Sequence, residues 1–290
     1  MDTFVLLQAL VSGVLIGGVF ALAAAGLTLI FGVLRIINFA HGEFLMLGMY
    51  MTYWLFVFFG IDPFLSLLVT VPATFALGAV IQRGLIAPVL KAPEEIQILL
   101  TLGLSLFLQN FALTVWSPDP RVVNVSYGTA TFQLGSTYVS WPRLAAFASA
   151  VVLALGLYAF LKTTELGRAI RAAADSRDGA QLVGIDVRRI YWIAFGIGAA
   201  CVGAAGSIIT PFFFTFPTVG LIFTLTSFVV VVLGSLGNFV GALVGGLIIG
   251  VAESLGEVFM PGSMKQVVTF GIFILVLLFR PTGLFGGRRL

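Results

Sequence analysis

The sequence predicts an all-α polytopic membrane protein with about nine transmembrane helices. Of its 290 residues, 60% are hydrophobic and only 9% are charged, and the mean hydropathy is +1.13. Apolar runs of about 20 residues, the length that an α-helix needs to cross a bilayer, recur along nearly the whole chain. Such spans must be helical because lipid offers no partners to unpaired backbone groups. We therefore expect one transmembrane domain over residues 1–290.

The expected spans follow one another with mostly short connections. In chain order they lie at residues 4–34, 44–59, 63–83, 96–116, 144–161, 190–210, 222–251 and 266–279. The first segment, ~45 Å as one helix, is longer than a bilayer core requires and must tilt or break. Gly26 and Gly32 are the expected break points. Pro63 is expected to open the third helix.

The segment 222–251 is long and rich in glycine. It contains Gly234-Ser235-Leu236-Gly237-Asn238, so we interpret it as two spans separated by a break, which brings the count to nine. A single tilted span here gives eight, and a first segment split at Gly26 gives ten. Broken helices can free backbone groups to line a pathway, although glycine also permits close helix packing. Gly237 and Asn238 are therefore candidate pathway residues.

Two segments are expected to lie outside the membrane. Residues 117–142 form a predicted external loop, with β-prone pieces at 122–125 and 137–140. Residues 162–189 carry ten of the 27 charged side chains of the protein. Counting turns from a cytoplasmic C-terminus, which includes Arg288 and Arg289, places twelve of the fifteen Lys and Arg on the side of this segment. This bias predicts that 162–189 faces the cytoplasm and that the N-terminus lies outside.

The charged segment has the pattern of an amphipathic helix beginning at Thr164. Arg168, Arg171, Asp175 and Asp178 would lie along one side, with apolar side chains along the other. A solvated loop that only sets topology is the alternative, but the length and helical order of the segment favour a docking element. The candidate coupling residues are Glu165, Leu166, Arg168, Ile170, Arg171, Ala173, Ala174, Asp175, Asp178 and Gly184.

The polar residues near the membrane are concentrated in Asn38, His41 and Glu43. One interpretation is structural: Asn38 caps the second helix, Glu43 lies in its first turn, and His41 faces the headgroups. The other is a substrate pathway or gate, because ionisable groups at membrane depth are costly and usually functional. Asn38-Phe39 and Asn238-Phe239 lie in similar apolar surroundings, which suggests an internal repeat.

Several classes of function are disfavoured. The net charge of +3 is not arranged as a basic stripe with aromatics, so nucleic acid is not an expected partner. One cysteine and one histidine cannot form a cluster of soft metal ligands. The chain contains no Gly-Lys dipeptide and hence no P-loop, and its scattered carboxylates do not form a convincing catalytic set. We expect no cofactor in this chain and no enzymatic activity of its own.

Three motifs resemble those of LivH-type permeases, the membrane subunits of branched-chain amino acid ABC importers. Residues 26–33 (GLTLIFGV) and 37–48 (INFAHGEFLMLG) are similar to the N-terminal signature of that family, and residues 166–185, which begin LGRAIRA, are similar to its cytoplasmic coupling region. The ending RPTGLFG, residues 280–286, also fits. The resemblance covers essentially the whole chain. It departs from the broader importer motif Glu-Ala-Ala followed by glycine, because Arg171-Ala172-Ala173 lacks the glutamate.

The resemblance implies a permease half in the bacterial inner membrane. Its expected partners are membrane lipid, a second related permease subunit, two subunits that bind ATP-Mg, and a periplasmic binding protein. Cargo would be branched-chain or other amino acids, although related permeases handle urea, amides or small carboxylates. A rival from another class is a secondary carrier driven by protons or sodium, with Glu43 or Glu253 as the titrating group.

Overall fold

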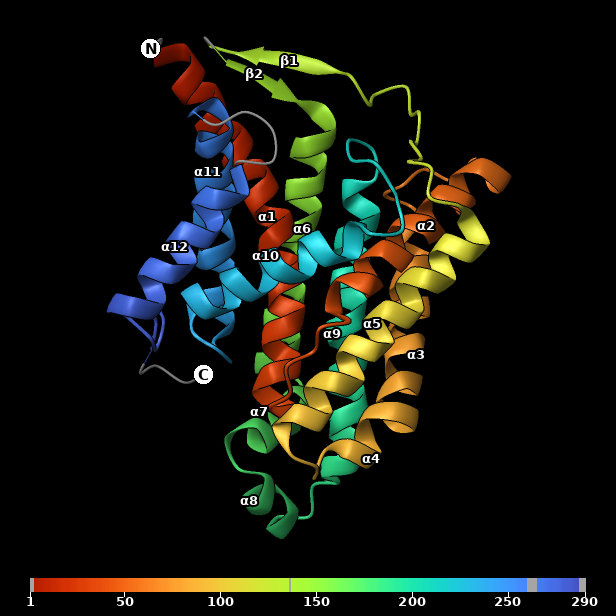
Figure 1. The fold of residues 1–290 in the computed structure, drawn as a ribbon, viewed down its shortest axis with the longest axis vertical. Coiled ribbons are helices and arrows are strands. Elements are labelled where there is room, and N and C mark those ends of the chain that lie inside the picture. Colours follow the sequence, from red (N-terminus) through yellow and green to blue (C-terminus); the bar gives the residue numbers. More distant parts are fainter. Residues whose placement is uncertain (1–2, 136, 260–264, 287–290) are drawn as a thin grey trace.

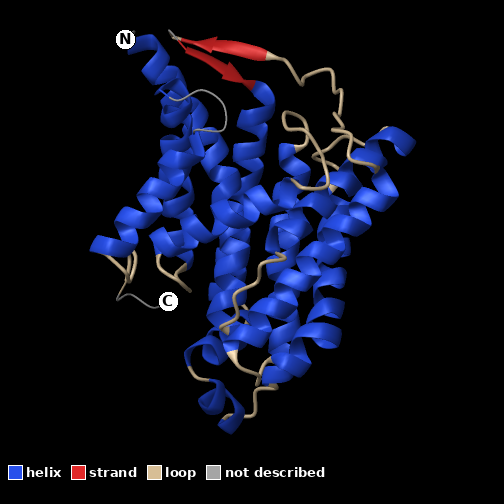
Figure 2. Cartoon of the chain, in the orientation of Figure 1, coloured by secondary structure: helices blue, strands red, loops and turns tan. Residues whose placement is uncertain are grey.

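The computed structural model describes residues 3–135, 137–259 and 265–286, and most of this chain is helical (Figures 1 and 2). The helices are α1 (Thr3–Leu34), α2 (His41–Phe59), α3 (Leu67–Ile81), the π-helix η1 (Gln82–Ile86), α4 (Ala87–Val89), α5 (Glu94–Trp116), α6 (Trp141–Thr163), α7 (Glu165–Asp175), α8 (Arg177–Leu182), α9 (Val187–Ile209), α10 (Val219–Gly234), α11 (Phe239–Phe259) and α12 (Lys265–Phe279). Two strands, β1 (Thr131–Leu134) and β2 (Thr137–Ser140), pair as an antiparallel hairpin.

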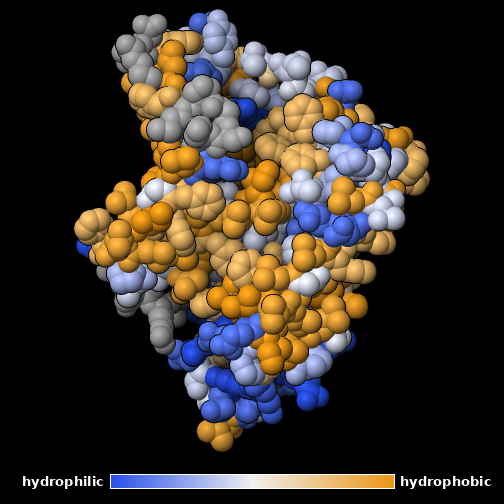
Figure 3. All heavy atoms as spheres, in the orientation of Figure 1, coloured by the Kyte–Doolittle hydropathy of each residue, from blue (hydrophilic) through white to orange (hydrophobic). Residues whose placement is uncertain are grey.

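The prediction of a helical membrane protein with about nine spans is confirmed. Within the described residues, seven helical segments are long and apolar enough to cross a membrane, and α10 and α12 are shorter apolar helices. One of the seven is the continuous segment Leu67–Val89, which joins α3, η1 and α4. On the face seen in Figure 3, apolar side chains cover most of the middle of the molecule, and hydrophilic side chains gather at the end formed by α7 and α8.

Helices α1 and α9 form the centre of the fold. In each of them 83% of the most apolar stretch of 18 residues is buried inside the protein, whereas only 22% of the corresponding stretch of α5 is buried. Helix α1 packs along α11, α9 and α6, and α9 also packs against α2 and α3. The protein is thus built around two buried helices, with α5 presenting most of its surface outward.

The expected break in the first segment is wrong, because α1 is one continuous helix. Gly26 instead allows α1 to approach α9: a methyl group on it would lie 2.5 Å from the carbonyl oxygen of Gly198. Gly32 similarly faces the backbone of Gly237: a methyl group on Gly32 would lie 3.5 Å from the Gly237 Cα. Glycine at these positions serves close packing, which is its common role between membrane helices.

The break at 234–238 is confirmed, because α10 ends at Gly234 and α11 begins at Phe239. The third helix does not begin at Pro63. A turn precedes it, in which Ser66 Oγ donates to the Pro63 carbonyl at 2.6 Å, and α3 starts at Leu67.

The segment 117–142 lies at the end of the molecule opposite α7 and α8 (Figure 1). The expected strand at 137–140 is present as β2, but its partner is β1, not the expected piece at 122–125. That piece forms no strand, and its neighbour Arg121 makes an isolated antiparallel bridge with Thr215. Arg288 and Arg289, which entered the charge count used for orientation, lie outside the described residues.

Candidate functional site: a polar re-entrant connection and a projecting helix pair

The connection between α1 and α2 turns back along α1. Helix α1 ends at Leu34, and Arg35 adopts a positive φ of 55° that reverses the chain. His41, the first residue of α2, then donates from Nε2 to the carbonyl oxygen of Ala23 at 2.9 Å. Ala23 precedes Leu34 by about three helical turns, or 16 Å along the axis. Helix α2 therefore begins beside α1 about two thirds of the way along that helix, within the length of its apolar span Phe4–Leu34.

The start of α10 meets the start of α2 at this depth. The backbone N–H of Gly42 donates to the hydroxyl of Thr224 at 2.8 Å. A methyl group on Gly220, in the first turn of α10, would lie 2.5 Å from Glu43 Oε2. Two helix N-termini, each carrying partial positive charge, therefore converge on one carboxylate.

Glu43 is fully buried in the first turn of α2. Its Oε1 accepts a 2.9 Å hydrogen bond from Ser105 Oγ on α5. The helix ends and this hydroxyl offset part of the cost of burying a carboxylate at membrane depth. Helix N-termini that converge on a polar site between membrane spans are typical of transporter binding sites.

The predicted residues Asn38, His41 and Glu43 lie together in this site, and all three are fully buried. The expectation that His41 faces the headgroups is therefore wrong. Asn38 does not cap α2 directly either: its Oδ1 accepts from the N–H of Ala40 at 3.1 Å, one residue before the helix. Asn38 Nδ2, His41 Nδ1 and Glu43 Oε2 make no hydrogen bond within the described part of the chain, so the cluster retains hydrogen-bonding capacity.

Gly237 and Asn238 lie apart from this cluster, in the connection between α10 and α11. Asn238 Oδ1 accepts from the N–H of Gly241 at 2.9 Å near the start of α11. Thr224, which contacts the cluster, is about 15 Å along α10 from the end of that helix. The five predicted pathway residues thus form two groups, joined by α10.

The two connections are built alike, as the suggested repeat requires. Each begins with a residue other than glycine at positive φ, Arg35 at 55° and Ser235 at 86°. Each has an asparagine three residues later, Asn38 and Asn238, whose side-chain oxygen accepts a backbone N–H close to the start of the next helix.

The charged segment forms two helices, not one continuous helix to Asp178. The predicted start at Thr164 is confirmed: Thr164 caps α7, and its Oγ1 accepts from the N–H of Gly167 at 2.9 Å. Ser176 leaves the helical region and caps α8 by accepting from the N–H of Gly179 at 3.1 Å. Gly184, at a φ of 84°, then turns the chain towards α9.

The predicted coupling residues divide between two faces. The apolar ones pack against the helical core, with Ile170 1% and Ala173 4% exposed. The charged ones, apart from the half-buried Arg171, are exposed, as is the turn at Gly184. The exposed residues are Glu165, Arg168, Asp175 and Asp178; the partly buried apolar residues are Leu166 and Ala174. The amphipathic pattern predicted for this segment is present.

Sequence reasoning missed two residues at the tip of this helix pair. Leu182, the last residue of α8, is 88% exposed, and Val183, which follows it, is 75% exposed. The sequence did contain a signal for them: Leu182 and Val183 are adjacent apolar residues inside the most charged segment of the chain. Exposed apolar side chains ringed by charge have the composition of an interface centre.

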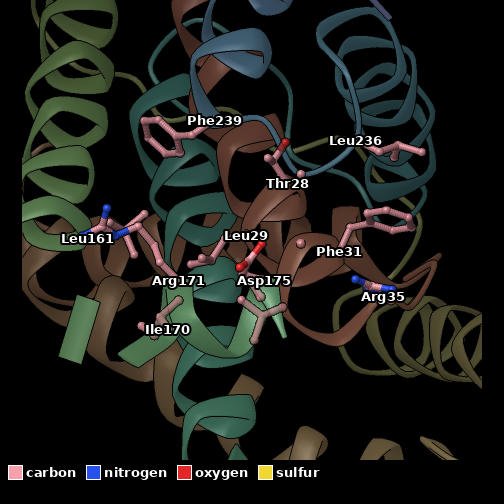
Figure 4. Close-up of a pocket in the computed structure, with 14 residues that line it drawn as sticks. Thr28, Leu29, Phe31, Arg35, Leu161, Ile170, Arg171, Asp175, Leu236 and Phe239 are labelled. Carbon is pink, nitrogen blue, oxygen red and sulfur yellow. The ribbon is translucent and has the colours of Figure 1, made fainter. Parts of the chain in front are cut away.

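A pocket of about 340 Å³ joins the helix pair to the break between α10 and α11 (Figure 4). Its walls come from the last turns of α1, from α6, α7 and the connection after α10. Gly237 and Asp175 both line it, so a predicted pathway residue and a predicted coupling residue share one cavity. Within the residues that the structure describes, no group of three His, Cys, Asp or Glu side chains could hold a metal ion.

A helical membrane permease is the class that this arrangement defines, because two helix N-termini meet at a buried polar site between the spans and a charged helix pair projects from one end. The chain belongs to the branched-chain amino acid transport permease family. The family described as "Branched-chain amino acid transport system / permease component" matches residues 9–277.

Individual relatives agree with this assignment. LivH of Salmonella typhimurium, a high-affinity branched-chain amino acid transport system permease protein, is 33% identical, and the alignment covers 97% of this chain and 95% of the relative. BraD of Pseudomonas aeruginosa is 34% identical with the same coverage. LivM of Salmonella typhimurium, also named as a permease protein of such a system, is 25% identical over 92% of this chain and 67% of the relative.

Proposed function

We propose that this chain is the permease subunit of an ATP-driven (ABC) importer for branched-chain amino acids in the bacterial inner membrane. The observation that carries the proposal is the projecting pair α7–α8, with its charged outer face and its exposed Leu182 and Val183. An ATPase subunit that docks on this pair would find an apolar centre with a charged rim. The excess of Lys and Arg at this end supports a cytoplasmic location.

Motion of α7 would reach the middle of the membrane through packed helices. Helix α7 contacts α1, α6 and α9. Helix α1 in turn holds His41 through the carbonyl of Ala23. ATP-driven movement of the helix pair would therefore shift the scaffold on which the Glu43 cluster is built, opening it alternately to the two sides.

The chain would form half of the translocation pathway. Its similarity to both LivH and LivM supports pairing with a second, related permease subunit. Two further subunits would bind and hydrolyse ATP-Mg, and a periplasmic binding protein would deliver the amino acid. The names of the relatives support branched-chain amino acids as cargo.

The test is reconstitution of the chain with its partner subunits, followed by ATPase and uptake measurements with leucine, isoleucine or valine and the binding protein. Uptake that depends on ATP and on the partners is the expected result. If urea, amides or small carboxylates stimulate ATP hydrolysis and amino acids do not, the proposed cargo is overturned. Uptake by this chain alone under a proton or sodium gradient would overturn the importer mechanism.

Docking is tested separately with Leu182→Asp, which puts a charge at the apolar tip. We expect the ATPase subunits to be lost from the purified complex. Leu134→Asp is the matched control, because Leu134 is 64% exposed on β1 at the opposite end. Charge reversal at Arg168 should weaken the same contact. A fully coupled complex carrying Leu182→Asp would contradict the docking assignment.

A further inference from the structure

We propose that the pocket beside α7 binds a zwitterionic amino acid with an aliphatic side chain from the side where α7 and α8 project, and that its occupancy slows ATP hydrolysis. The inference rests on the proposed function and adds a regulatory site to it: imported amino acid, accumulating in the cytoplasm, would act back on the importer.

Both charges of a zwitterion find a counterpart in the lining. Arg35 and Arg171 supply cations for a carboxylate, and Asp175 supplies an anion for an ammonium group. In Figure 4 the Asp175 carboxylate points towards the middle of the pocket, with Arg171 on one side of the view and Arg35 on the other. Within the described residues the ion pair of α7 is Arg168–Glu165 at 3.8 Å, and neither of those residues lines the pocket.

Two further polar atoms of the lining have unused hydrogen-bonding capacity. Thr28 Oγ1 on α1 and Arg171 Nε on α7 are buried, and neither has a hydrogen-bond partner in the described part of the chain. Thr28 is only 2% exposed. Buried polar atoms are nearly always hydrogen-bonded, so a polar ligand in the pocket would supply the hydrogen-bond partners that these two atoms lack.

The remaining walls are apolar and suit an aliphatic side chain. Leu29 and Phe31 from α1, Leu161 from α6 and Phe239 from α11 line the cavity. Its volume of about 340 Å³ is at the small end of ligand pockets, which fits a molecule of amino-acid size. Apolar walls with a few placed charges give both affinity and orientation.

The pocket lies on the proposed coupling route, between α7 and the end of α1. A ligand held by Asp175 on α7 and by Arg35 at the end of α1 would tie the two elements together, beside the break at Gly237. A ligand that binds one conformation more tightly shifts the population towards it. Occupancy would therefore hold the coupling helix in the conformation seen here and slow the ATPase cycle.

The experiment uses the whole importer in lipid nanodiscs, without binding protein, with ATP hydrolysis measured as L-leucine is added. We expect saturating leucine to lower the rate about fivefold. 4-Methylpentanoate lacks the ammonium group and isoamylamine lacks the carboxylate, so neither should inhibit. Equal effects of all three compounds, or no effect of leucine, would overturn the proposal.

Variants locate the site, with each rate normalised to the same variant without amino acid. Asp175→Asn should raise the leucine concentration for half-inhibition about tenfold, because a charge-assisted hydrogen bond is lost. Arg35→Gln should act alike from another helix, which keeps the test valid if Asp175→Asn fails to assemble. Glu165→Gln is the matched control: it removes a carboxylate of the same helix outside the pocket, and inhibition should persist. If neither pocket variant changes the leucine concentration for half-inhibition, leucine binds elsewhere, and the assignment of the site to this pocket is overturned.

Failure of this inference is distinguishable from failure of the proposed function. The same purified importer, reconstituted in parallel into closed proteoliposomes, is assayed for ATP-dependent leucine uptake with the binding protein present. If uptake is normal but leucine does not inhibit ATP hydrolysis, the proposed regulatory site is wrong and the importer assignment stands. Absence of any amino acid uptake would instead overturn the proposed function.

Discussion

Gly42 and Gly220 lie in such close contact that a methyl group on Gly42 would overlap the carbonyl oxygen of Gly220. This contact brings the N-terminus of α2 onto the first turn of α10 and so builds the polar site around Glu43. The hydroxyl of Thr224, which accepts from the Gly42 N–H, would also be displaced, since an added Cβ would lie 2.5 Å from its oxygen.

Gly42→Ala should therefore push the two helices apart and abolish most transport. Overpacking of this kind costs about 1–3 kcal/mol, which thermal unfolding of the purified complex would record. Gly103→Ala is the control, because a methyl group there meets nothing within 4 Å and should leave uptake unchanged. Equal activity of the two variants would show that the contact does not hold the site.

Glu43 provides a second prediction that separates function from stability. Glu43→Gln keeps the shape of the side chain and removes its charge from between the two helix N-termini. Because burying a carboxylate is costly, the thermal stability should stay the same or rise. Uptake should nevertheless fall by about tenfold, the equivalent of 1.36 kcal/mol of lost charge–dipole interaction during the cycle.

The matched control is Glu253→Gln on α11. Glu253 also accepts a hydroxyl hydrogen bond, from Thr269 at 3.0 Å, but it lies outside the Glu43 site. We expect its variant to transport normally. Loss of uptake in Glu253→Gln together with full activity in Glu43→Gln would show that Glu253 on α11, not Glu43, is the carboxylate that transport requires.

Local signals predicted most of the helices. The break after α10 was readable because Gly234 and Gly237 interrupt an apolar run, and the start of α7 because Thr164 precedes an amphipathic pattern. Glycine alone is ambiguous, however. Gly26 fits a helix break and a tight helix contact equally well, and only its position against Gly198 shows that it is a contact.

The depth of the polar site could not be predicted. Nothing in the residues between Arg35 and His41 indicates that the chain turns back along α1, because an irregular segment has no periodicity. The partners of Glu43 are also remote in sequence, with Ser105 on α5 and Gly220 on α10. The pocket beside α7 was missed for the same reason, since its walls come from four separate parts of the chain.

A third prediction concerns Tyr127, which donates a 2.5 Å hydrogen bond to Asp62 Oδ2 and fastens the segment before β1 to the connection between α2 and α3. Burial, and then the hydrogen bond to Asp62 and its negative charge, raise the pKa of the Tyr127 phenol above its usual range. Tyr127→Phe should lower the free energy of unfolding by about 1 kcal/mol.

The raised pKa sets the pH window of this effect. The folded state favours the neutral phenol, so its contribution is fully present below the ordinary pKa of 10.0 and is lost only as the pH rises beyond it. Thermal unfolding at pH 6 and pH 8 should therefore show the same loss. Tyr138→Phe, an exposed hydroxyl on β2, should change nothing. A loss confined to one of the two pH values would contradict this account.

The last prediction concerns the corner between α6 and α7, through which the coupling helix is held. A methyl group on Gly167 would collide with the carbonyl oxygen of Phe160 and lie 2.6 Å from the Leu161 backbone. Thr164 tightens the same corner by donating its hydroxyl to the Phe160 carbonyl at 2.7 Å. Helix α7 therefore follows α6 as a rigid bend, which is what transmission of force from a docked ATPase requires.

Gly167→Ala should displace α7 from that bend without altering the exposed tip at Leu182. We expect the ATPase subunits to remain in the purified complex, while leucine uptake per ATP hydrolysed falls by about tenfold, since changes along a coupling route alter the coupling free energy by up to about 2 kcal/mol. Gly156→Ala, on the exposed side of α6 with nothing within 4 Å of an added Cβ, should transport normally. If Gly167→Ala loses the ATPase subunits altogether, the bend positions the docking surface; if coupling is unchanged, the force travels by another route.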